Sequence, residues 1–458
     1  INPIERRGPD EKKYFSVNDF KIGATRLSIR DLENGSQPFF FEEYGTYVAL
    51  NGEIYNYEYL RNKILERGYK FKSNCDTELI GPGYHFFGNN FFNMINGMFA
   101  IAILDVKKDM FLLARDRFGI KPIYYHLDKN EFYFSSSAKS IFQMESFKKE
   151  LDLNNLENIL KKRYIDKNLH IFKNIYQIKP GHLITFSRTE LLKSIKFVKD
   201  DILVTKENLE NTIQNFFNIS IQDYKISDVE ICLLISSGID SNLIFNYLYE
   251  KNIKIFNISF ENSKYDELKK IRKLLTDEQA SNLNVIEFTK DKFINNISET
   301  IKAFDSPICD SVIFPMFSLF DNISEKYKVT ISGEGADEIF GGYDFIRYTK
   351  IFLFIRKYKL KNFVYWLVRI IPTSILSLFI SYQGIFDKLF KKRLLKLLSS
   401  KDADLKDFYN FLSVFDDQDL SEMLYQPIDI KKKAEEKNQK LSLEKIFFDL
   451  INSWLPNY

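Results

Sequence analysis

The stretch from Ile231 to Ser241 constrains the fold of this chain more than any other. An apolar run ends there abruptly in the letters Ser-Ser-Gly, and a helix-like pattern follows from Asn242. This order predicts a buried strand, a tight turn and the N-terminus of a helix. Backbone N–H groups and the positive end of a helix dipole make such a turn a candidate anion site, although an ordinary serine-capped turn gives the same pattern.

The polar residues of this turn suit a polyphosphate that carries a metal ion. The hydroxyl groups of Ser236 and Ser241 can donate hydrogen bonds to phosphate oxygens. Asp240 repels a bare anion but suits the Mg²⁺ that accompanies a polyphosphate. The spacing differs from the G-x-x-x-x-G-K-[ST] pattern, so a Walker-type loop is excluded.

From residue 228 onward, strands and helices alternate along the sequence. This rhythm predicts a parallel sheet, whose ligand sites lie at the carboxyl ends of the strands. Beyond Tyr343 the pattern becomes mostly helical and rich in Lys, Leu and Phe. The expected strands are 228–235, 253–260, 284–288 and 328–332, and the expected helices are 207–225, 242–250 and 266–275.

The first third of the chain is β-rich. Short runs of β-branched and aromatic residues are separated by turn signals, with helical patterns between them. We expect a layered α/β sandwich here, closed by a loop-rich zone from about Asp152 to Phe186. The expected strands are 20–28, 46–50, 99–104, 110–114 and 123–126, and the expected helices are 58–67 and 76–87.

Composition narrows the partners and the compartment. The 458 residues are 45% hydrophobic and 28% charged, which is typical of a globular protein long enough for two or three domains. A net charge of +3 gives no pull toward nucleic acid. Cys75, Cys232 and Cys309 are far apart in the sequence, so they predict a reducing, cytoplasmic compartment and no zinc site.

The apolar segment of residues 362–382 is long enough to pass for a membrane span. Arg369 and Pro372 lie in its middle, where a charge is costly in hydrocarbon and a proline interrupts a helix. We therefore expect two amphipathic helices at a domain surface, and no membrane partner.

A second strand-to-helix turn lies between Val329 and Tyr343. Its apolar strand ends in the letters Ser-Gly-Glu-Gly, and two more carboxylates follow. These carboxylates repel one another unless a cation lies among them, although a solvated acidic loop is the alternative. Asp337 and Asp240 would lie at the same edge of the sheet, so we expect them to hold Mg²⁺ that bridges to a nucleotide. Glu334 is the candidate general base.

Taken together, these motifs resemble those of a known family. Ser236–Ser241 is similar to the S-G-G-x-D-S pyrophosphate loop of the ATP-pyrophosphatase superfamily, and Ser332–Tyr343 looks like the second nucleotide motif of glutamine-dependent asparagine synthetases. The glutaminase half of that family is matched, in order, by Arg7–Asp10, Arg26–Ile29, Asn51–Tyr57, Asp76–Glu78, Gly97–Ala100 and Ala114–Tyr125. The resemblance implies an Ntn-hydrolase-like α-β-β-α sandwich over residues 1–186. It also implies a parallel-sheet PP-loop domain, adenine nucleotide α-hydrolase-like and with a helical C-terminal part, over residues 205–458.

In the glutaminase half, the resemblance implies a glutamine site. Arg26 would pair with the α-carboxylate of glutamine, a bidentate task that suits a guanidinium group. Asp76 and the segment Asn51-Gly52-Glu53 would hold the α-amino group. Asn51 and the N–H group of Gly52 would also form the oxyanion hole for a thioester-forming step.

In the other half, the resemblance implies that ATP, Mg²⁺ and aspartate bind. The side-chain carboxylate of aspartate would attack the α-phosphate of ATP, giving β-aspartyl-AMP and pyrophosphate, and ammonia carried from the glutamine site would displace AMP. Glu334 would deprotonate the incoming ammonium or the ammonia adduct, and Asp240 and Asp337 would bind Mg²⁺. The positions implied for ATP and pyrophosphate are Leu234, Ser236, Ser237, Gly238, Asp240, Ser241, Ile258, Ser332, Gly333, Asp337 and Tyr343. A homodimer is the expected assembly.

Several positions depart from the family pattern. The family's nucleophile is an N-terminal cysteine whose own amino group acts as base, whereas this sequence begins at Ile1 and ends at Tyr458. We therefore expect a fragment cut at both ends and inactive in glutamine hydrolysis, with Cys75 structural. Ser237 replaces a usual glycine, which adds a side chain in the tightest part of the loop. Ser137 replaces a frequent glutamate.

Two other classes of protein fit the same motifs. One is a different PP-loop enzyme, such as a β-lactam-forming synthetase or an amidotransferase acting on a sugar acid, because the acceptor pocket is not legible in the sequence. The other is a catalytically inactive paralogue that binds nucleotide as a regulatory or scaffolding subunit. Aspartate as the acceptor is the favoured prediction, and it rests in part on analogy with the family.

Overall fold

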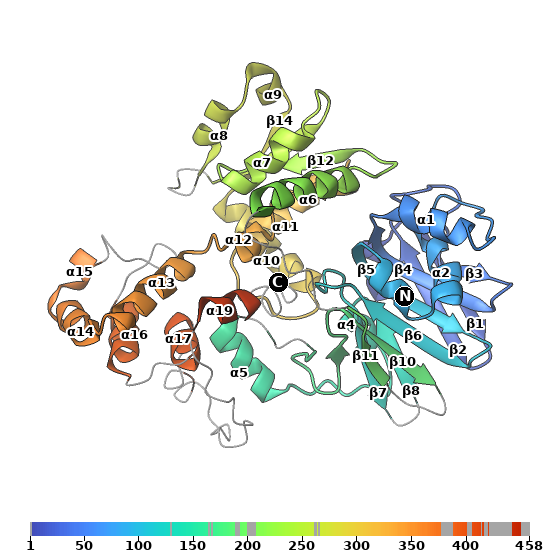
Figure 1. The fold of residues 1–458 in the computed structure, drawn as a ribbon, viewed down its shortest axis with the longest axis horizontal. Helices are drawn as coiled ribbons and strands as arrows, with labels where there is room; N and C mark the ends of the chain where they lie inside the picture. Colours follow the sequence, from blue (N-terminus) through green and yellow to red (C-terminus); the bar gives the residue numbers. More distant parts are fainter. Residues whose placement is uncertain are drawn as a thin grey trace. The chain divides into compact units, whose positions relative to one another are not determined.

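The computed structural model divides the chain into two compact units (Figure 1). The first comprises residues 1–150, 172–306 and 311–334, and the second comprises residues 151–171, 307–310 and 335–458. The residues that the structure describes are 2–128, 131–163, 165, 168–187, 193–198, 208–260, 263, 266–376, 388–400, 405–413, 415, 420 and 442–449. The terminal segment 453–458 lies outside them.

An antiparallel sheet of six strands organises the first half of the first unit, in the order β11-β10-β6-β5-β4-β3. The central strand β5 (Gly97–Asp105) pairs with β4 (Thr46–Ile54) and with β6 (Met110–Arg115). Seven of its nine residues are buried, because both faces of the sheet are covered. The outer strands are β3 (Phe39–Phe41), β10 (His182–Ser187) and β11 (Lys193–Lys196).

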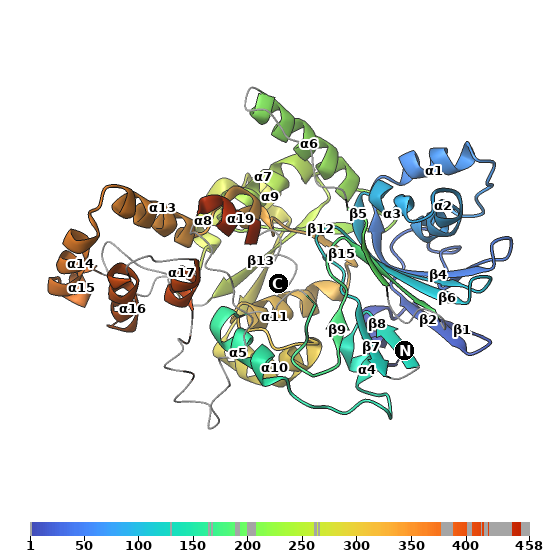
Figure 2. The ribbon, with the colours of Figure 1, turned by 60° about the horizontal axis from the view of Figure 1, so that its bottom comes forward.

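Each face of this sheet packs on a layer of its own (Figure 2). Ile101 and Ile103 point into a core beneath the helices, whereas Ala102 and Leu104 point into a second core on the opposite face. This alternation follows from the two-residue period of a strand. The helical layer holds α1 (Tyr57–Leu65), the 3₁₀ helix η2 (Asp76–Leu79), α2 (Ile80–Phe87) and α3 (Asn90–Met94). The opposite layer holds β1 (Glu11–Val17), β2 (Phe20–Arg26), β7 (Tyr124–Asp128), β8 (Glu131–Ser135) and β9 (Tyr176–Gln177).

A parallel sheet of four strands, in the order β14-β13-β12-β15, completes the first unit. An antiparallel sheet followed by a parallel one confirms the predicted α/β fold class. The strands are β12 (Ile231–Leu234), β13 (Lys254–Phe260), β14 (Leu283–Phe288) and β15 (Val329–Ile331). The helices are α4 (Ala138–Ile141), α6 (Leu209–Tyr224), α7 (Ile239–Leu248), α8 (Leu268–Leu274), α9 (Asp277–Ser281), α10 (Lys290–Ala303) and α11 (Ile313–Ser324), with the N-terminal 3₁₀ helix η1 (Asn2–Arg7).

The second unit is helical in its described residues, and its core includes Phe352, Val368 and Phe408. The hydrophobic segment 362–382 forms two helices up to Leu376, broken before Pro372, and its remaining residues lie outside the described part. None of the described helices has both the length and the apolar character that crossing a membrane requires. The helices are α5 (Leu153–Lys162), α12 (Ala336–Phe340), α13 (Asp344–Lys357), α14 (Lys361–Ile370), α15 (Thr373–Leu376), α16 (Lys388–Ser399), α17 (Leu405–Leu412) and α19 (Leu443–Asp449).

The prediction of a loop-rich zone from Asp152 to Phe186 is wrong. Helix α5 begins directly after Asp152, whose carboxylate accepts hydrogen bonds from the N–H groups of Asn154 and Asn155. A side chain of this kind at the N-cap offsets the low helix propensity of asparagine. Strand β10 occupies the end of the same zone and is held by pairing with β6 and β11, which a local pattern does not reveal.

Candidate functional site

A cavity of about 1290 Å³ opens between the six-stranded sheet and the layer that contains β1 and β2. All five residues predicted to bind glutamine line it: Arg26, Asn51, Gly52, Glu53 and Asp76. They come from β2, β4 and the first residue of η2. The structure therefore brings together residues that are up to 50 positions apart, as the motifs predict.

Two carboxyl groups meet at the polar end of this cavity. The carboxyl groups of Glu53 and Asp76 lie close enough for the charge of Asp76 to act on Glu53. Burial, together with the charge of Asp76, raises the pKa of Glu53 to about 8, and burial raises the pKa of Asp76 as well. The N–H group of Ile54 donates to Oδ2 of Asp76 at 3.1 Å and fixes its orientation. A cationic ligand group such as an ammonium would let both carboxyl groups ionise.

Asn51 and Gly52 present polar groups to the cavity from β4. The side-chain nitrogen of Asn51 is buried and has no hydrogen-bond partner among the described residues. Leaving a buried donor without a partner costs roughly 1–3 kcal/mol, so this nitrogen is suited to a ligand oxygen. Gly52 has φ +150°, and a Cβ there would lie 2.0 Å from the carbonyl oxygen of Met98. Only glycine therefore fits at this position.

The guanidinium group of Arg26 is buried and held by the loop that follows β2. It donates to the carbonyl oxygens of Arg30, Asp31 and Leu32 at 3.0, 2.7 and 3.3 Å. A Cβ on Gly35 would lie 2.1 Å from Nη2 of Arg26, so this glycine makes room for the guanidinium group. These contacts fix the position of Arg26 at the cavity wall.

Two further cationic side chains line the cavity, and the motifs did not single them out as site residues. Arg30 lies over the ring of Tyr57 at 3.7 Å and is close enough to lower the pKa of Glu53. Burial, and next the charge of Arg7, lowers the pKa of Lys121. Both lie within or beside a matched motif, at Arg26–Ile29 and Ala114–Tyr125, and that proximity was the available signal.

Cys75 touches the cavity but lacks the surroundings of a nucleophile. Its thiol is buried and lies 3.7 Å from Oδ1 of Asp76 and 3.6 Å from the hydroxyl oxygen of Thr77. Burial, and next the charge of Asp76, raises the pKa of this thiol to about 12. A reactive cysteine needs a lowered pKa, so the environment suits a structural role.

The second polar site lies where β12 ends. The hydroxyl group of Ser241 lies 2.8 Å from that of Ser236 and accepts from the N–H group of Ser236 at 3.1 Å. The side-chain nitrogen of Asn242 donates to the carbonyl oxygens of Ser236 and Gly238 at 2.9 and 2.6 Å. These bonds close the turn, and helix α7 begins at Ile239, three residues earlier than the pattern indicates.

The two strand-to-helix turns lie against each other. Strand β12 pairs in parallel with β15, with Leu233 opposite Ile331, so both strands end at the same edge of the sheet. A Cβ on Gly333 would lie 2.9 Å from the backbone nitrogen of Ser241 and 3.1 Å from Cβ of Asp240. The absence of a side chain at Gly333 therefore lets the second turn touch the start of α7.

Ser237, the unusual residue of the first turn, causes no backbone strain there. Its φ is not positive, so the backbone of this turn does not require glycine at that position. Its N–H group donates to Oε2 of Glu267 at 2.9 Å. A carboxylate thus occupies one of the N–H groups that a phosphate would need. The sequence pattern gave no sign of Glu267.

The remaining predicted positions divide between the two units. Leu234 ends β12, Ile258 lies within β13, and the N–H group of Glu334 lies 3.4 Å from the hydroxyl oxygen of Ser332. In the second unit, Asp337 lies in the first turn of α12, and the hydroxyl group of Tyr343 donates to Glu338 at 2.6 Å. Within the described residues, no group of three or more His, Cys, Asp or Glu side chains is arranged to hold a metal ion.

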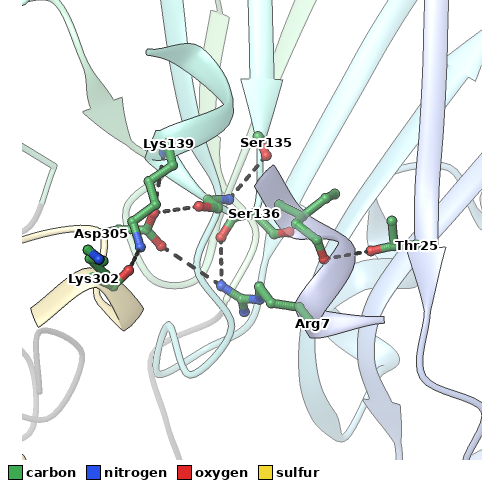
Figure 3. A network of polar contacts seen from close by, with 9 residues as sticks. Arg7, Thr25, Ser135, Ser136, Lys139, Lys302 and Asp305 are labelled. Atoms are coloured by element: carbon green, nitrogen blue, oxygen red, sulfur yellow. Dashed lines mark hydrogen bonds and ion pairs between the residues drawn. The ribbon is translucent and has the colours of Figure 1, made fainter. Parts of the chain in front are cut away.

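A network around Asp305, two residues beyond the end of α10, joins the end of this helix to the first half of the first unit (Figure 3). Asp305 accepts from the hydroxyl group of Ser137 at 2.5 Å and lies 3.9 Å from the guanidinium group of Arg7. The ammonium group of Lys139 donates to the carbonyl oxygen of Lys302. Ser137, which departs from the family pattern, therefore makes a polar contact of its own.

Comparison with known proteins identifies the family of each half of the chain. Residues 1–196 match the family described as a glutamine amidotransferase domain, and residues 212–458 match the family described as asparagine synthase. Both halves of the predicted resemblance are thus found independently. The chain belongs to the asparagine synthase family.

Three relatives illustrate how far the similarity extends. The asparagine synthetase [glutamine-hydrolyzing] 1 of Bacillus subtilis is 29% identical over 353 residues, which are 75% of this chain and 55% of the relative. A putative asparagine synthetase [glutamine-hydrolyzing] 2 of Methanocaldococcus jannaschii is 30% identical over 76% of this chain and 74% of its own length. The amidase chry2 of Gibberella zeae is 26% identical over 76% of this chain and 55% of its own length. The chain thus spans little more than half the length of two of these relatives.

Proposed function

We propose that this protein amidates aspartate to asparagine at the expense of ATP, with ammonia from glutamine. The observation that carries the proposal is the contact between the two strand-to-helix turns, where Gly333 lies against Asp240 and Ser241. In a parallel sheet, such an edge is the usual place for a nucleotide. The cavity residues that are proposed to bind glutamine support glutamine as the ammonia source.

The proposed chemistry has two steps. A side-chain carboxylate oxygen of aspartate forms a bond to the α-phosphorus of ATP, and the bond to the β-phosphate oxygen breaks, releasing pyrophosphate. Ammonia then attacks the acyl carbon of β-aspartyl-AMP, AMP leaves, and Glu334 takes the proton. The pyrophosphate would lie on Ser236, Ser237, Gly238, Asp240 and Ser241, and the rest of the nucleotide would contact Leu234, Ile258, Ser332, Gly333 and Tyr343.

Mg²⁺ fits the chemistry of Asp240. This carboxylate lies in the first turn of α7 and has no hydrogen bond or ion pair with other described residues, and carboxylate oxygen is a preferred ligand of Mg²⁺. The ion would neutralise the charge that develops on the leaving pyrophosphate. Asp337 is the proposed second ligand.

In the cavity, the proposed ligand is glutamine. Arg26 would bind its α-carboxylate, and the Glu53 and Asp76 pair would bind its α-ammonium group. Asn51 and the N–H group of Gly52 would stabilise the oxyanion that forms on the amide carbon once a cysteine nucleophile attacks it. The 458 residues are expected to lack that nucleophile, so this chain by itself should bind glutamine without hydrolysing it. The expected homodimer stays part of the proposal, and sedimentation velocity would test it.

The direct test supplies the purified chain with ATP, Mg²⁺, aspartate and ammonia. The expected products are AMP, pyrophosphate and asparagine in equal amounts. Formation of ADP and phosphate would contradict the proposal, since the bond broken would then not be the one at the α-phosphorus.

A matched pair of variants tests the site. Asp240→Asn removes a proposed Mg²⁺ ligand and is expected to lower AMP formation by about a hundredfold or more, because a metal ligand and transition-state charge are lost together. Asp277→Asn makes the same change in the first turn of α9, where the side chain is exposed, and is expected to leave the rate unchanged. Equal effects of the two variants would refute the role of Asp240.

Two alternatives fit specific observations. The similarity to an amidase at 26% identity keeps an acceptor other than aspartate open, such as a sugar acid or a β-amino acid. AMP release that depends on such an acid but not on aspartate would support it. An inactive nucleotide-binding paralogue would bind ATP without forming AMP with any acid.

A further inference from the structure

Helix α14 of the second unit is apolar on both of its faces. Val364, Tyr365 and Val368 pack in or against the core of this unit. On the opposite face, Phe363 and Trp366 are 58% and 56% exposed, and Ile370 at the end of the same stripe is 57% exposed. A helix face that is exposed to water is ordinarily polar. The exposed apolar face of α14 therefore indicates a binding surface.

Helix α13, which precedes α14 in the chain, also exposes apolar side chains. Ile351, Phe354 and Tyr358 recur at helical spacing on its exposed side, and the rings of Phe354 and Tyr358 lie 4.5 Å apart. The exposed side chains of Lys350 and Lys357 stand among them. We refer to Ile351, Phe354, Tyr358, Phe363, Trp366 and Ile370 as the aromatic stripe.

The segment of the chain that carries the aromatic stripe has charges of one sign. Residues 345–376, all of them described, contain seven Lys or Arg and no Asp or Glu, whereas the whole chain has 65 basic and 62 acidic residues. This segment thus departs sharply from the near balance of the chain. Exposed aromatic and aliphatic side chains interleaved with cations are the pattern of a helix that lies in a membrane interface.

We propose that the aromatic stripe is a peripheral binding surface for an anionic lipid bilayer. The ring and aliphatic side chains would enter the boundary between headgroups and acyl chains, and the surrounding lysines and arginines would reach the phosphates. With ten residues, α14 is about 15 Å long, which is half the thickness of a hydrocarbon core. The helix would therefore lie in the membrane interface and would not span the bilayer. The proposal departs from the expectation of no membrane partner that was drawn from the sequence.

Charge decides against the other occupants of the stripe. A second copy of this chain would bring seven like charges against seven in a symmetric contact, which is unfavourable. Nucleic acid would satisfy the cations but would leave Ile351 and Ile370 without apolar partners. An anionic bilayer satisfies both kinds of side chain.

Fluorescence of the full chain tests the proposal. The chain has two tryptophans, so Trp454→Phe leaves Trp366 as the sole reporter. With vesicles of phosphatidylglycerol and phosphatidylcholine, the emission of Trp366 is expected to shift to shorter wavelength and to be quenched by brominated acyl chains. Vesicles of phosphatidylcholine alone are expected to bind about tenfold more weakly or worse, because the attraction to the anionic surface is lost.

Two pairs of substitutions distinguish binding through the aromatic stripe from non-specific adsorption through any exposed apolar side chain. Phe363→Ser with Ile370→Ser is expected to weaken co-sedimentation with anionic vesicles at least tenfold, while AMP formation in solution stays unchanged. Phe216→Ser with Ile219→Ser removes equally exposed apolar side chains from α6 and is expected to change neither. The proposal would be overturned if the first pair of substitutions left vesicle binding undiminished, or if Trp366 were not quenched. It would also be overturned if the chain bound RNA in place of vesicles, or formed a dimer that the first pair dissociates.

Discussion

The carboxylate of Asp10 accepts a hydrogen bond from the ammonium group of Lys328 at 2.6 Å, across 318 positions of sequence. The N–H group of Ser28 donates to the same oxygen at 2.7 Å. Burial raises the pKa of Asp10, but the contacts with Lys328 and Ser28 outweigh it and hold that pKa below its usual value. Lys328 directly precedes β15, so this ion pair fastens the strand that leads to the second nucleotide turn.

Breaking this ion pair is expected to loosen β15 locally. Both side chains are about one-third exposed, so solvent screening limits the pair to about 1 kcal/mol or less. In Lys328→Met, hydrogen exchange of the β15 amides should therefore quicken by up to about fivefold, as the local opening free energy falls. Lys326→Met changes an exposed lysine nearby and is the control. Equal exchange in both variants would show that the pair carries no stability.

The contact between the two turns was predictable from the sequence, because it follows from the topology of the parallel sheet. Once strands near Ile231 and Val329 belong to one parallel sheet, their carboxyl ends lie at one edge, and Asp240 and Gly333 become neighbours. The cavity residues were found through matched motifs, and the structure gathers them into one place. The predictions failed or were silent where a distant partner decides the outcome.

Three features depend on such distant partners. Strand β10 exists because β6 and β11 pair with it, and Glu267 reaches the turn at Ser237 from 30 positions away. Gly35 is required only because the guanidinium group of Arg26 folds back against it. No local pattern of hydrophobic and polar residues records contacts of this kind.

The Glu53 and Asp76 pair should make stability depend on pH. Burial and the charge of Asp76 raise the pKa of Glu53 to about 8 in the folded protein, above the 4.5 of an exposed glutamate. The folded state therefore keeps a proton that the unfolded state loses. The stabilising contribution is complete below about pH 4.5 and is lost as the pH rises toward 8. The melting temperature should fall across that window, and Glu53→Gln should flatten the fall.

A control distinguishes this pair from the other carboxyl groups of the protein. Glu58 is exposed on α1, so Glu58→Gln should leave the pH profile as it is. A profile that is the same in wild type and Glu53→Gln would contradict the raised pKa. Addition of glutamine should reduce the pH dependence in the wild type, because its ammonium group favours both ionised carboxylates.

The close approach of Gly333 predicts a steric effect on nucleotide binding. In Gly333→Ala the new Cβ would lie 2.9 Å from the nitrogen of Ser241, which is backbone and yields little. Overpacking of this kind costs about 1–3 kcal/mol, so the affinity for ATP should fall by about tenfold or more. Isothermal titration calorimetry measures it, with Ser281→Ala at the exposed end of α9 as control. An unchanged affinity would show that the two turns do not bind ATP together.

The contact between Glu267 and Ser237 predicts a gain of affinity. The N–H group of Ser237 donates to the carboxylate of Glu267 at 2.9 Å, and this N–H group is among those proposed to bind pyrophosphate. Glu267 therefore competes with the ligand both for the hydrogen bond and through its negative charge. A hydrogen bond to a charged group is worth about 1.5–3 kcal/mol, and part of that is regained from water. Glu267→Ala should thus bind pyrophosphate about three- to tenfold more tightly in a calorimetric titration.

Two further variants define the cause of that gain. Glu267→Gln removes the charge but keeps an oxygen that can accept from Ser237, so its affinity for pyrophosphate should lie between those of wild type and Glu267→Ala. Glu278→Ala removes an exposed carboxylate from α9 and should have no effect. Weaker binding by Glu267→Ala would mean that the carboxylate holds the turn in its binding shape, and competition would then be the wrong interpretation. If all three variants match the wild type, pyrophosphate does not use the N–H group of Ser237, and the proposed seat of the leaving group must move toward Ser236 and Ser241.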